Sequence, residues 1–197
     1  GEICGSGMDD DNDGYGDNCF GLDALNDIGD PVDEVGHGTM VSGIIGAIGN
    51  NVTGITGVNW QTSLMALKFI GSDGTGRVSD FIQAIEFAMD NDVRIINMSF
   101  GSYNPSQLER QAIQNAGNIL FVAAAGNESA NNDISPLYPA GYDLPNIISV
   151  AASNQSDSLI YFSNYGPQTV SLAAPGINIL STDLLDSYRV GSGTSTS

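Results

Sequence analysis

The chain has little positive charge. Its 197 residues include five Lys plus Arg against 23 Asp plus Glu, so its formal net charge is −18. Nucleic acids and anionic membrane surfaces bind to cationic protein surfaces, so the sequence argues against both as partners. Cations are the partners that this charge favours, although solubility alone explains it equally well.

Long hydrophobic runs are also missing. No eighteen consecutive residues are apolar, so no transmembrane helix is expected. Residues 1–13 are polar and acidic, unlike a signal peptide, which predicts that the chain begins after any targeting segment. Hydrophobic residues still make up 41% of the sequence, enough for a substantial core in one domain of ordinary size.

Cysteine is scarce, and its two positions are informative. Cys4 and Cys19 bracket the most acidic segment of the chain. A pair that clamps a short loop fits an oxidising compartment better than the cytosol, which favours a secreted or extracellular protein. Two free thiols are the alternative.

The chain has one histidine, His37, in Gly36-His37-Gly38-Thr39 just before the apolar stretch Val41 to Ile48. No other side chain titrates near neutral pH without perturbation, so imidazole general-base chemistry has one place to occur. The flanking glycines and the apolar residues predict a buried helix that presents His37 at its start. The alternative is an exposed or structural histidine.

From Ser63 onward, short apolar runs alternate with helical patterns, which is typical of an α/β fold with a mostly parallel sheet. The predicted strands are Leu64–Ile70, Val93–Phe100, Ile119–Ala125 and Ile147–Ala152. One predicted helix has Ser79 as N-cap and apolar Ile82, Ile85 and Met89; the next begins at Pro105, buries Leu108, Ala112 and Ile113, and ends at Gly117. Residues 1–35 show no lasting helix or strand pattern and predict a metal-ordered loop before a core of residues 36–197, within a single domain.

Ligands of open α/β sheets bind beyond the carboxyl ends of the strands, so the residues that end the apolar runs are candidates for chemistry. Asn127 follows the run Ala123-Ala124-Ala125-Gly126 and offers an amide donor for an oxyanion, although it could be an ordinary turn residue. Ser195 lies in Gly191-Ser192-Gly193-Thr194-Ser195 and is the candidate nucleophile, although such a cluster is also typical of a flexible tail.

The motifs around His37, Asn127 and Ser195 occur in the order and spacing of the subtilisin-like serine peptidases, which the chain closely resembles. The match includes Asn97-Met98-Ser99-Phe100-Gly101 and the loop Asn50 to Val58, and extends from about Asp30 to the last residue. The resemblance implies a three-layer, doubly wound, mostly parallel sheet, truncated here at both ends.

The resemblance also implies roles. Ser195 would attack the scissile carbonyl, His37 would take and return the proton, and Asn127 with the Ser195 amide would hold the oxyanion. The substrate-binding edge would be formed by Ser99, Phe100 and Gly101, faced by Gly74, Thr75 and Gly76. The substrate would then be a polypeptide bound as an added strand. The side-chain pocket would lie near Ala123 to Gly126 and Leu137 to Tyr138, and the bulk of Leu137 hints at a shallow pocket.

Some features depart from the family pattern. The family's catalytic Asp ends a strand upstream of the histidine in an Asp-Thr/Ser-Gly motif, and no such motif precedes His37. The acidic residues before it lie in loop sequence, and none is assigned as the triad acid: Asp23, Asp27, Asp30 and Asp33. The family's helix after the nucleophile is also missing, which predicts an interior fragment whose own activity is in question. Met40 replaces a second histidine, and Thr196-Ser197 replaces Met-Ala.

The segment Asp9 to Asp17 follows a calcium-loop pattern. Its predicted ligands are the side chains of Asp9, Asp11, Asp13 and Asp17 and the carbonyl of Tyr15. Phe20 stands where an EF-hand has Glu, so the segment looks more like a thrombospondin type 3 calcium loop; an acidic loop without metal is the alternative. The Asn51 loop resembles the family's calcium site, through the Asn51 side chain and three carbonyls, although upstream ligands are absent.

Three functions are weighed. The first is a secreted, monomeric, calcium-stabilised serine endopeptidase that works through an acyl-enzyme. The second is a catalytically inactive domain of the same fold that serves as a calcium-dependent binding or structural module. The third, an α/β-hydrolase esterase, is disfavoured because its Ser precedes its His and lies in a Gly-x-Ser-x-Gly motif that this chain lacks.

Overall fold

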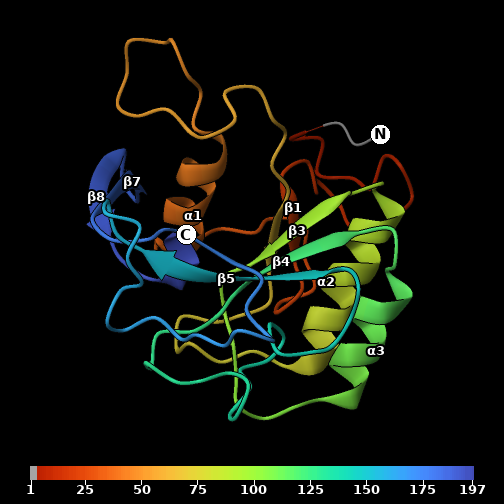
Figure 1. Ribbon diagram of the computed structural model, residues 1–197. Coiled ribbons are helices and arrows are strands. Elements are labelled where there is room, and N and C mark those ends of the chain that lie inside the picture. The colour runs from red at the N-terminus through yellow and green to blue at the C-terminus, as the bar shows by residue number, and fades with distance from the viewer. Residues whose placement is uncertain (1–3) are drawn as a thin grey trace. The chain divides into compact units, whose positions relative to one another are not determined.

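The computed structural model describes residues 4–197 and divides them into two compact units. The first unit runs up to Asp90 and includes Thr182–Ser187; the second comprises Asn91–Ser181 and Tyr188–Ser197. The elements follow the chain in the order drawn in Figure 1. Each unit has its own parallel strand pairing, so the α/β class with parallel strands is confirmed.

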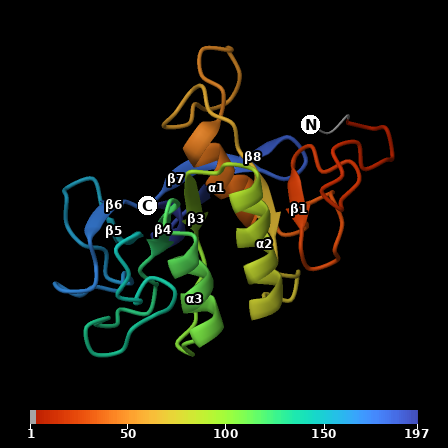
Figure 2. The ribbon, with the colours of Figure 1, turned by 90° about the vertical axis from the view of Figure 1, so that its right-hand side faces the viewer.

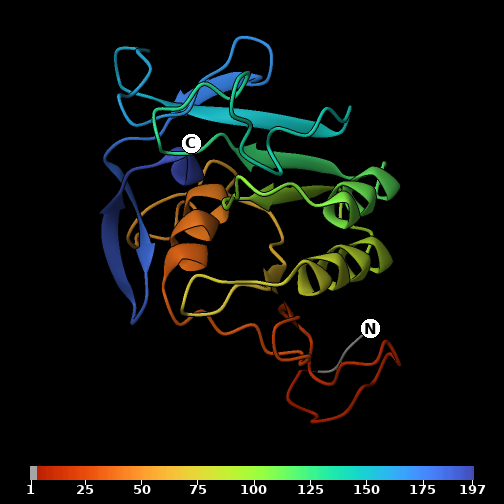
Figure 3. The same ribbon diagram turned by 90° about the horizontal axis from the view of Figure 1, so that it is seen from below.

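The second unit is built on a four-stranded parallel sheet. Its strands are, in spatial order, β3 (Ile95–Met98), β4 (Leu120–Ala124), β5 (Ile147–Ser153) and β6 (Leu172–Pro175). Figures 1 and 3 show β3, β4 and β5 as neighbouring arrows. The apolar runs that contain β3, β4 and β5 were predicted as strands, and these predictions are confirmed.

The helix α3 (Gln107–Asn115) connects β3 to β4. It begins after the N-cap Ser106, whose side chain accepts a hydrogen bond from the N–H of Glu109. Ile113 is fully buried as predicted, but Leu108 is 68% exposed, so the predicted burial of Leu108 is wrong. The connections between β4 and β5 and between β5 and β6 contain no helix, as the blue-green loops in Figure 2 show.

In the first unit, β1 (Gly21–Asp23) pairs in parallel with β2 (Ala66–Lys68). Leu22 of β1 joins Ala24, Ala84 and Phe87 in a buried core, against which Leu67 of β2 packs. The strand β1 lies within residues 1–35, so the prediction that no strand forms there is wrong. Asp23, predicted to lie in an unburied loop, is 2% exposed and its carboxylate pairs with Lys68 Nζ at 3.2 Å. This pairing satisfies the buried charge.

The first unit also contains α1 (His37–Gly46) and α2 (Val78–Asp90). Both helices were predicted. Ser79, however, lies inside α2 instead of capping it, and its hydroxyl donates to Asp80 Oδ1 at 2.8 Å. Met89 is 43% exposed, because the buried face of α2 is formed by Phe81, Ala84, Ile85, Phe87 and Ala88.

The chain ends with a hairpin of β7 (Ile179–Asp183) and β8 (Ser187–Gly191), followed by the short 3-10 helix η1 (Thr194–Thr196). None of the helices in the described part of the chain combines the length and the apolar character that a bilayer crossing requires. The helix η1 matters most for function, because it carries the candidate nucleophile.

Candidate active site

Ser195 lies on η1, beside the end of β3. It is half-buried, and its Oγ donates to the carbonyl of Ser99 at 3.2 Å. In return, Ser99 Oγ donates to the carbonyl of Ser195 at 3.1 Å, and Asn97 Nδ2 donates to Ser99 Oγ at 2.8 Å. The reciprocal bonds fix η1 against the residue that follows β3. A hydroxyl can rotate about its C–O bond, so this arrangement leaves Ser195 able to give its proton to a base.

Asn127 follows β4 and reaches the same place. Its Oδ1 accepts from the N–H of Thr194 at 2.8 Å and from Thr194 Oγ1 at 3.2 Å. A backbone N–H can only donate, so the atom facing Thr194 must be the amide oxygen and Nδ2 must point away from it. Asn127 is exposed, which leaves this Nδ2 group placed to donate to a bound molecule beside Ser195.

Thr194 joins the two motifs. It is 3% exposed, and its Oγ1 accepts from the N–H of Gly126 at 3.1 Å while it donates to Asn127. The predicted nucleophile and the predicted oxyanion donor therefore lie close together within one unit, because Asn127 is hydrogen-bonded to Thr194, the residue before Ser195. Chemically, this arrangement offers a hydroxyl and an amide donor at one point of the surface.

His37 is the first residue of α1, in the first unit, and its side chain is exposed. The preceding residue, Gly36, adopts φ 84°, which glycine accepts without strain. The start of α1 is held by Asp33, whose carboxylate accepts from the N–H groups of Val35, Gly36 and Thr39 and from the Thr39 hydroxyl. Burial alone would raise the pKa of Asp33, but these donors outweigh it and lower the pKa to about 2.

Gly74, Thr75 and Gly76 form an exposed turn, also in the first unit. Gly76 pairs with Ile70 through an isolated antiparallel bridge, and Gly71 donates to the carbonyl of Thr75 at 2.8 Å. The N–H of Gly74 also donates to the carbonyl of Gly71 at 2.9 Å, so the turn is held by bonds within its own segment.

The other predicted binding segment follows β3. Ser99 and Phe100 are half-buried, and Gly101 is exposed. The next residue, Ser102, pairs with Tyr138, with both N–H···O distances at 2.8 Å. This pairing brings Leu137 against Gly101, where an added Cβ would lie 2.6 Å from Leu137 Cδ2.

Leu137 also contacts the segment after β4. A Cβ at Gly126 would lie 2.8 Å from the same Leu137 Cδ2, and Leu137 is 6% exposed. The side chain therefore fills the space between the segment that follows β3 and the segment that follows β4. Leu137 therefore lies between the two segments near which the side-chain pocket was predicted.

The acidic loop (residues 4–20) is closed by the predicted disulfide between Cys4 and Cys19, which is confirmed. Carboxylate oxygens of Asp9, Asp11 and Asp13 lie within 4.8 Å of one another, the spacing that a cation needs. Asp17, also predicted as a ligand, instead accepts from the N–H groups of Gly5 and Gly7. Three of the four predicted carboxylates are therefore grouped.

Tyr15 connects the acidic loop to the core of the first unit. Its ring packs edge-on against Phe87 with centroids 5.8 Å apart, and its hydroxyl accepts from Gln83 Nε2 at 2.7 Å. The predicted role of Tyr15 concerned its backbone carbonyl, so the side chain is free to serve as this anchor.

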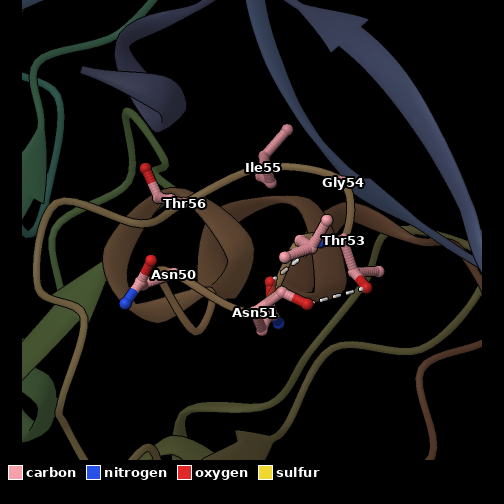
Figure 4. Close-up of a pocket in the computed structure, with 7 residues that line it drawn as sticks. Asn50, Asn51, Thr53, Gly54, Ile55 and Thr56 are labelled. Carbon is pink, nitrogen blue, oxygen red and sulfur yellow. Dashed lines mark hydrogen bonds between the residues drawn. The ribbon is translucent and has the colours of Figure 1, made fainter.

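The Asn51 loop lines a pocket of about 430 Å³ formed by residues 50–56 (Figure 4). Asn51 Oδ1 accepts from the N–H of Thr53 at 3.1 Å, and Thr53 Oγ1 donates to the carbonyl of Asn51 at 3.4 Å. The Asn51 side chain, predicted as a calcium ligand, therefore already orders its own loop.

The sequence analysis missed two buried amides, Asn132 and Asn164. Asn132 is 1% and Asn164 0% exposed, and Asn164 Nδ2 donates to Asn132 Oδ1 at 3.1 Å. Asn132 ends the segment of residues 126–132, which we call the Asn127 loop. Asn164 lies in Phe162-Ser163-Asn164-Tyr165, outside any predicted element. No local pattern could have revealed it, because its side-chain partners lie more than thirty residues away.

The chain is similar to known proteins in sequence and in fold. The family model of the subtilases, Peptidase S8, matches residues 8–197. Subtilisin-like protease 2 of Plasmodium falciparum (isolate 3D7) is 39% identical over 171 residues, which are 84% of this chain and 13% of that protein. The minor extracellular protease Epr of Bacillus subtilis (strain 168) is 38% identical over 165 residues, 83% of this chain and 25% of that protein.

Among solved structures, a cold adapted subtilisin-like serine proteinase matches with a TM-score of 0.74 at 30% identity, over 89% of this chain and 62% of that one. The chain thus spans less than two thirds of the length of each of these relatives. The family model covers nearly the whole chain, the Ser195 and Asn127 motifs included, and the chain belongs to the subtilase family.

Proposed function

We propose that this chain carries the catalytic residues of a serine endopeptidase, which hydrolyses peptide bonds through an acyl-enzyme. Membership of the subtilase family supports serine peptidase chemistry in general. The observation that carries the specific assignment is the contact of Thr194 with Asn127, because it orients an amide donor beside the hydroxyl of Ser195.

In the proposed reaction, Ser195 Oγ forms a bond to the scissile carbonyl carbon while His37 takes the hydroxyl proton. The carbonyl oxygen becomes an oxyanion, to which Asn127 Nδ2 and the Ser195 N–H donate. The C–N bond then breaks as His37 returns the proton to the leaving amine. Water, activated by His37, hydrolyses the ester and restores Ser195.

The substrate in this proposal is a polypeptide bound in extended form. Ser99, Phe100 and Gly101 would pair with its backbone on one side and Gly74, Thr75 and Gly76 on the other. Secretion is part of the proposal, since the Bacillus subtilis relative is called an extracellular protease and the Cys4–Cys19 disulfide suits an oxidising compartment. We further propose a monomer.

Leu137 is proposed to limit the side chain that precedes the scissile bond. Its position between Gly101 and Gly126 supports a preference for Gly or Ala there. Leu137→Ala should open the space and raise kcat/KM for substrates with Leu or Phe at that position by about 10- to 100-fold relative to Ala, the range that a few methylenes contribute. Profiling with a peptide library measures the ratio, and an unchanged profile would contradict the assignment.

Calcium is the proposed structural cofactor of the acidic loop. The grouped carboxylates of Asp9, Asp11 and Asp13 offer the hard oxygen ligands that Ca²⁺ prefers, and three close negative charges are costly without a cation. The carbonyl of Tyr15 is proposed as a further ligand. Asp17 lies outside the grouped carboxylates and accepts from the N–H groups of Gly5 and Gly7, so it is proposed to order the loop.

The test of the enzyme hypothesis is active-site labelling with a fluorophosphonate probe. The complete gene product that contains these residues should label at Ser195, and both Ser195→Ala and His37→Ala should abolish labelling. Arg189→Lys, a conservative change on β8, is the matched control and should label normally. A folded, calcium-loaded protein that does not label would rule the enzyme out.

A second function, a catalytically inactive binding module, is favoured by one observation. Two carboxylates upstream of His37 are engaged elsewhere, Asp23 with Lys68 and Asp33 with the N–H groups that start α1. Neither is therefore placed to orient the imidazole as a triad acid would. Absence of labelling together with calcium-dependent folding would support this function instead.

A further inference from the structure

We propose that Asn164 is a positioning residue that holds Asn127 where it can donate to the oxyanion, an inference that rests on the proposed function. Asn164 is fully buried and follows Ser163, well away along the chain from the Asn127 loop. It would act through the backbone on either side of Asn127 and would not touch the substrate.

The side chain of Asn164 uses both ends of its amide. Its Oδ1 accepts from the N–H of Glu128 at 2.9 Å and from that of Ala130 at 3.0 Å. Its Nδ2 donates to Asn132 Oδ1 at 3.1 Å and to the Tyr103 hydroxyl at 3.4 Å. An amide with one acceptor and two donor hydrogens is thereby fully paired, and because it is buried, it has one stable orientation.

Asn164 also holds the residue before Asn127. Its N–H donates to the carbonyl of Gly126 at 2.9 Å. Gly126 has φ 113°, and an added Cβ there would overlap Asn164 Nδ2, so the two residues are in close contact. The backbone is therefore fixed by Asn164 immediately before and immediately after Asn127.

Asn127 itself is exposed and depends on these neighbours. Its N–H donates to Glu128 Oε2 at 2.8 Å, and its Oδ1 is bound by Thr194. Without the Asn164 amide, the N–H groups of Glu128 and Ala130 lose their acceptor and the Asn127 loop can shift. A small displacement of a preorganised donor removes much of its stabilisation of a transition state.

The test measures kcat and KM for peptide hydrolysis by the complete gene product, with active sites counted by titration. Asn164→Ala should lower kcat by about 10- to 100-fold with KM within about two-fold, which is below the roughly 10²–10³-fold reported for removing the corresponding donor in subtilisin itself. In an Asn127→Ala background, Asn164→Ala should cause no further loss. An equal loss in both backgrounds would show general destabilisation and overturn the proposal.

A conservative variant guards against a protein that fails to fold. Asn164→Asp keeps an acceptor oxygen for the N–H groups of Glu128 and Ala130 but places its other oxygen against Asn132 Oδ1, so stability should fall. Its kcat per titrated active site should still recover to within about five-fold of the unmodified protein. A kcat as low as that of the alanine variant would contradict positioning. Asn146→Ala is the matched control: this amide bonds the carbonyl of Ile113, away from the Asn127 loop, so stability should fall and kcat per active site should not.

The two proposals can fail separately. If hydrolysis is the same in Ser195→Ala as in the unmodified protein, the proposed function is wrong. The positioning is then decided by NMR on the Asn127 side-chain amide, whose order parameter should fall in Asn164→Ala and stay unchanged in Asn146→Ala. An unchanged order parameter in Asn164→Ala would overturn the positioning as well.

Discussion

The Asn127 loop and the acidic loop are both irregular and polar, yet they are held in opposite ways. The Asn127 loop is bonded from beneath by the neutral, buried amide of Asn164. The acidic loop is bonded by its own charges, since Asp9 accepts from the N–H groups of Asp13 and Gly14 and Asp17 accepts from those of Gly5 and Gly7. The first loop is ordered by a buried neutral side chain from a distant part of the chain, and the second by carboxylates of its own.

This difference indicates what each loop should respond to. A buried neutral amide needs no counter-ion, and its hydrogen bonds do not change with pH or salt. Crowded carboxylates repel one another, so their order depends on cations and ionic strength. The Asn127 loop should therefore be sensitive to steric change and insensitive to calcium, and the acidic loop should behave in the reverse way.

The largest expected effect is steric. Gly126→Ala places a Cβ against Asn164 Nδ2 and within 2.8 Å of Leu137 Cδ2 and Glu128 Oε2, at φ 113°. The free energy of unfolding should fall by about 3–4 kcal/mol from backbone strain and overpacking together. Urea denaturation, followed by the loss of structure in the second unit, measures this change in the free energy of unfolding.

Gly14→Ala is the matched control in the acidic loop. Gly14 has φ 100°, but no atom lies within 4 Å of an added Cβ. Its cost should be limited to the backbone conformation, about 1 kcal/mol. Equal costs at the two glycines would show that packing does not distinguish the two loops.

The next effect concerns calcium. Removing it with EGTA should lower the free energy of unfolding by about 2–3 kcal/mol if calcium was present at 100 times its Kd. Amide exchange should rise in the acidic loop and stay unchanged in the Asn127 loop. Asp11→Asn should reduce the response, because it removes one of the three grouped carboxylates.

Asp157→Asn controls for the lost charge, since Asp157 is an exposed residue of the second unit. It should leave the EGTA response intact. If EGTA does not change the stability of the unmodified protein, or if amide exchange rises equally in both loops, the proposed difference between the two loops is wrong.

Most of the fold was predictable because it depends on local pattern. The runs that became β3, β4 and β5 are continuous and apolar, as buried parallel strands require. The strand β1 was missed because its three residues are defined by pairing with β2, far along the chain, and not by their own pattern. Leu108 was misassigned because helical spacing fits more than one face of a short helix.

The arrangement around Thr194 was predictable only in part. Asn127 follows the apolar run that became β4, where the carboxyl ends of parallel strands meet. Ser195 follows the β8 hairpin instead, so only the resemblance of its motif to the subtilisin-like family suggested that it lies near Asn127. Asn164 could not be found in this way. Its importance comes from four side-chain hydrogen bonds to distant residues, and an isolated Asn has the same appearance in any loop.

The smallest expected effect concerns Asp33, which offers a third case for the comparison. Here a half-buried carboxylate holds the backbone at the start of α1. Asp33 has a native pKa of about 2 against an ordinary value of 3.8. Because the native pKa is the lower one, its stabilisation is present above about pH 4 and is lost as the pH falls through about 2. The contribution should be about 1 kcal/mol, since solvent screens a partly exposed carboxylate.

The measurement compares the unmodified protein with Asp33→Asn, both in EGTA so that the acidic loop contributes nothing that depends on calcium. The stability difference should be about 1 kcal/mol near pH 5 and should shrink as the pH approaches 2, because protonation removes the charge that binds the N–H groups of Gly36 and Thr39. A difference that stays constant over this range would mean that geometry holds the start of α1. Asp33 would then hold the backbone by hydrogen-bond geometry, as Asn164 does. Charge would then not explain the difference between the Asn127 loop and the acidic loop.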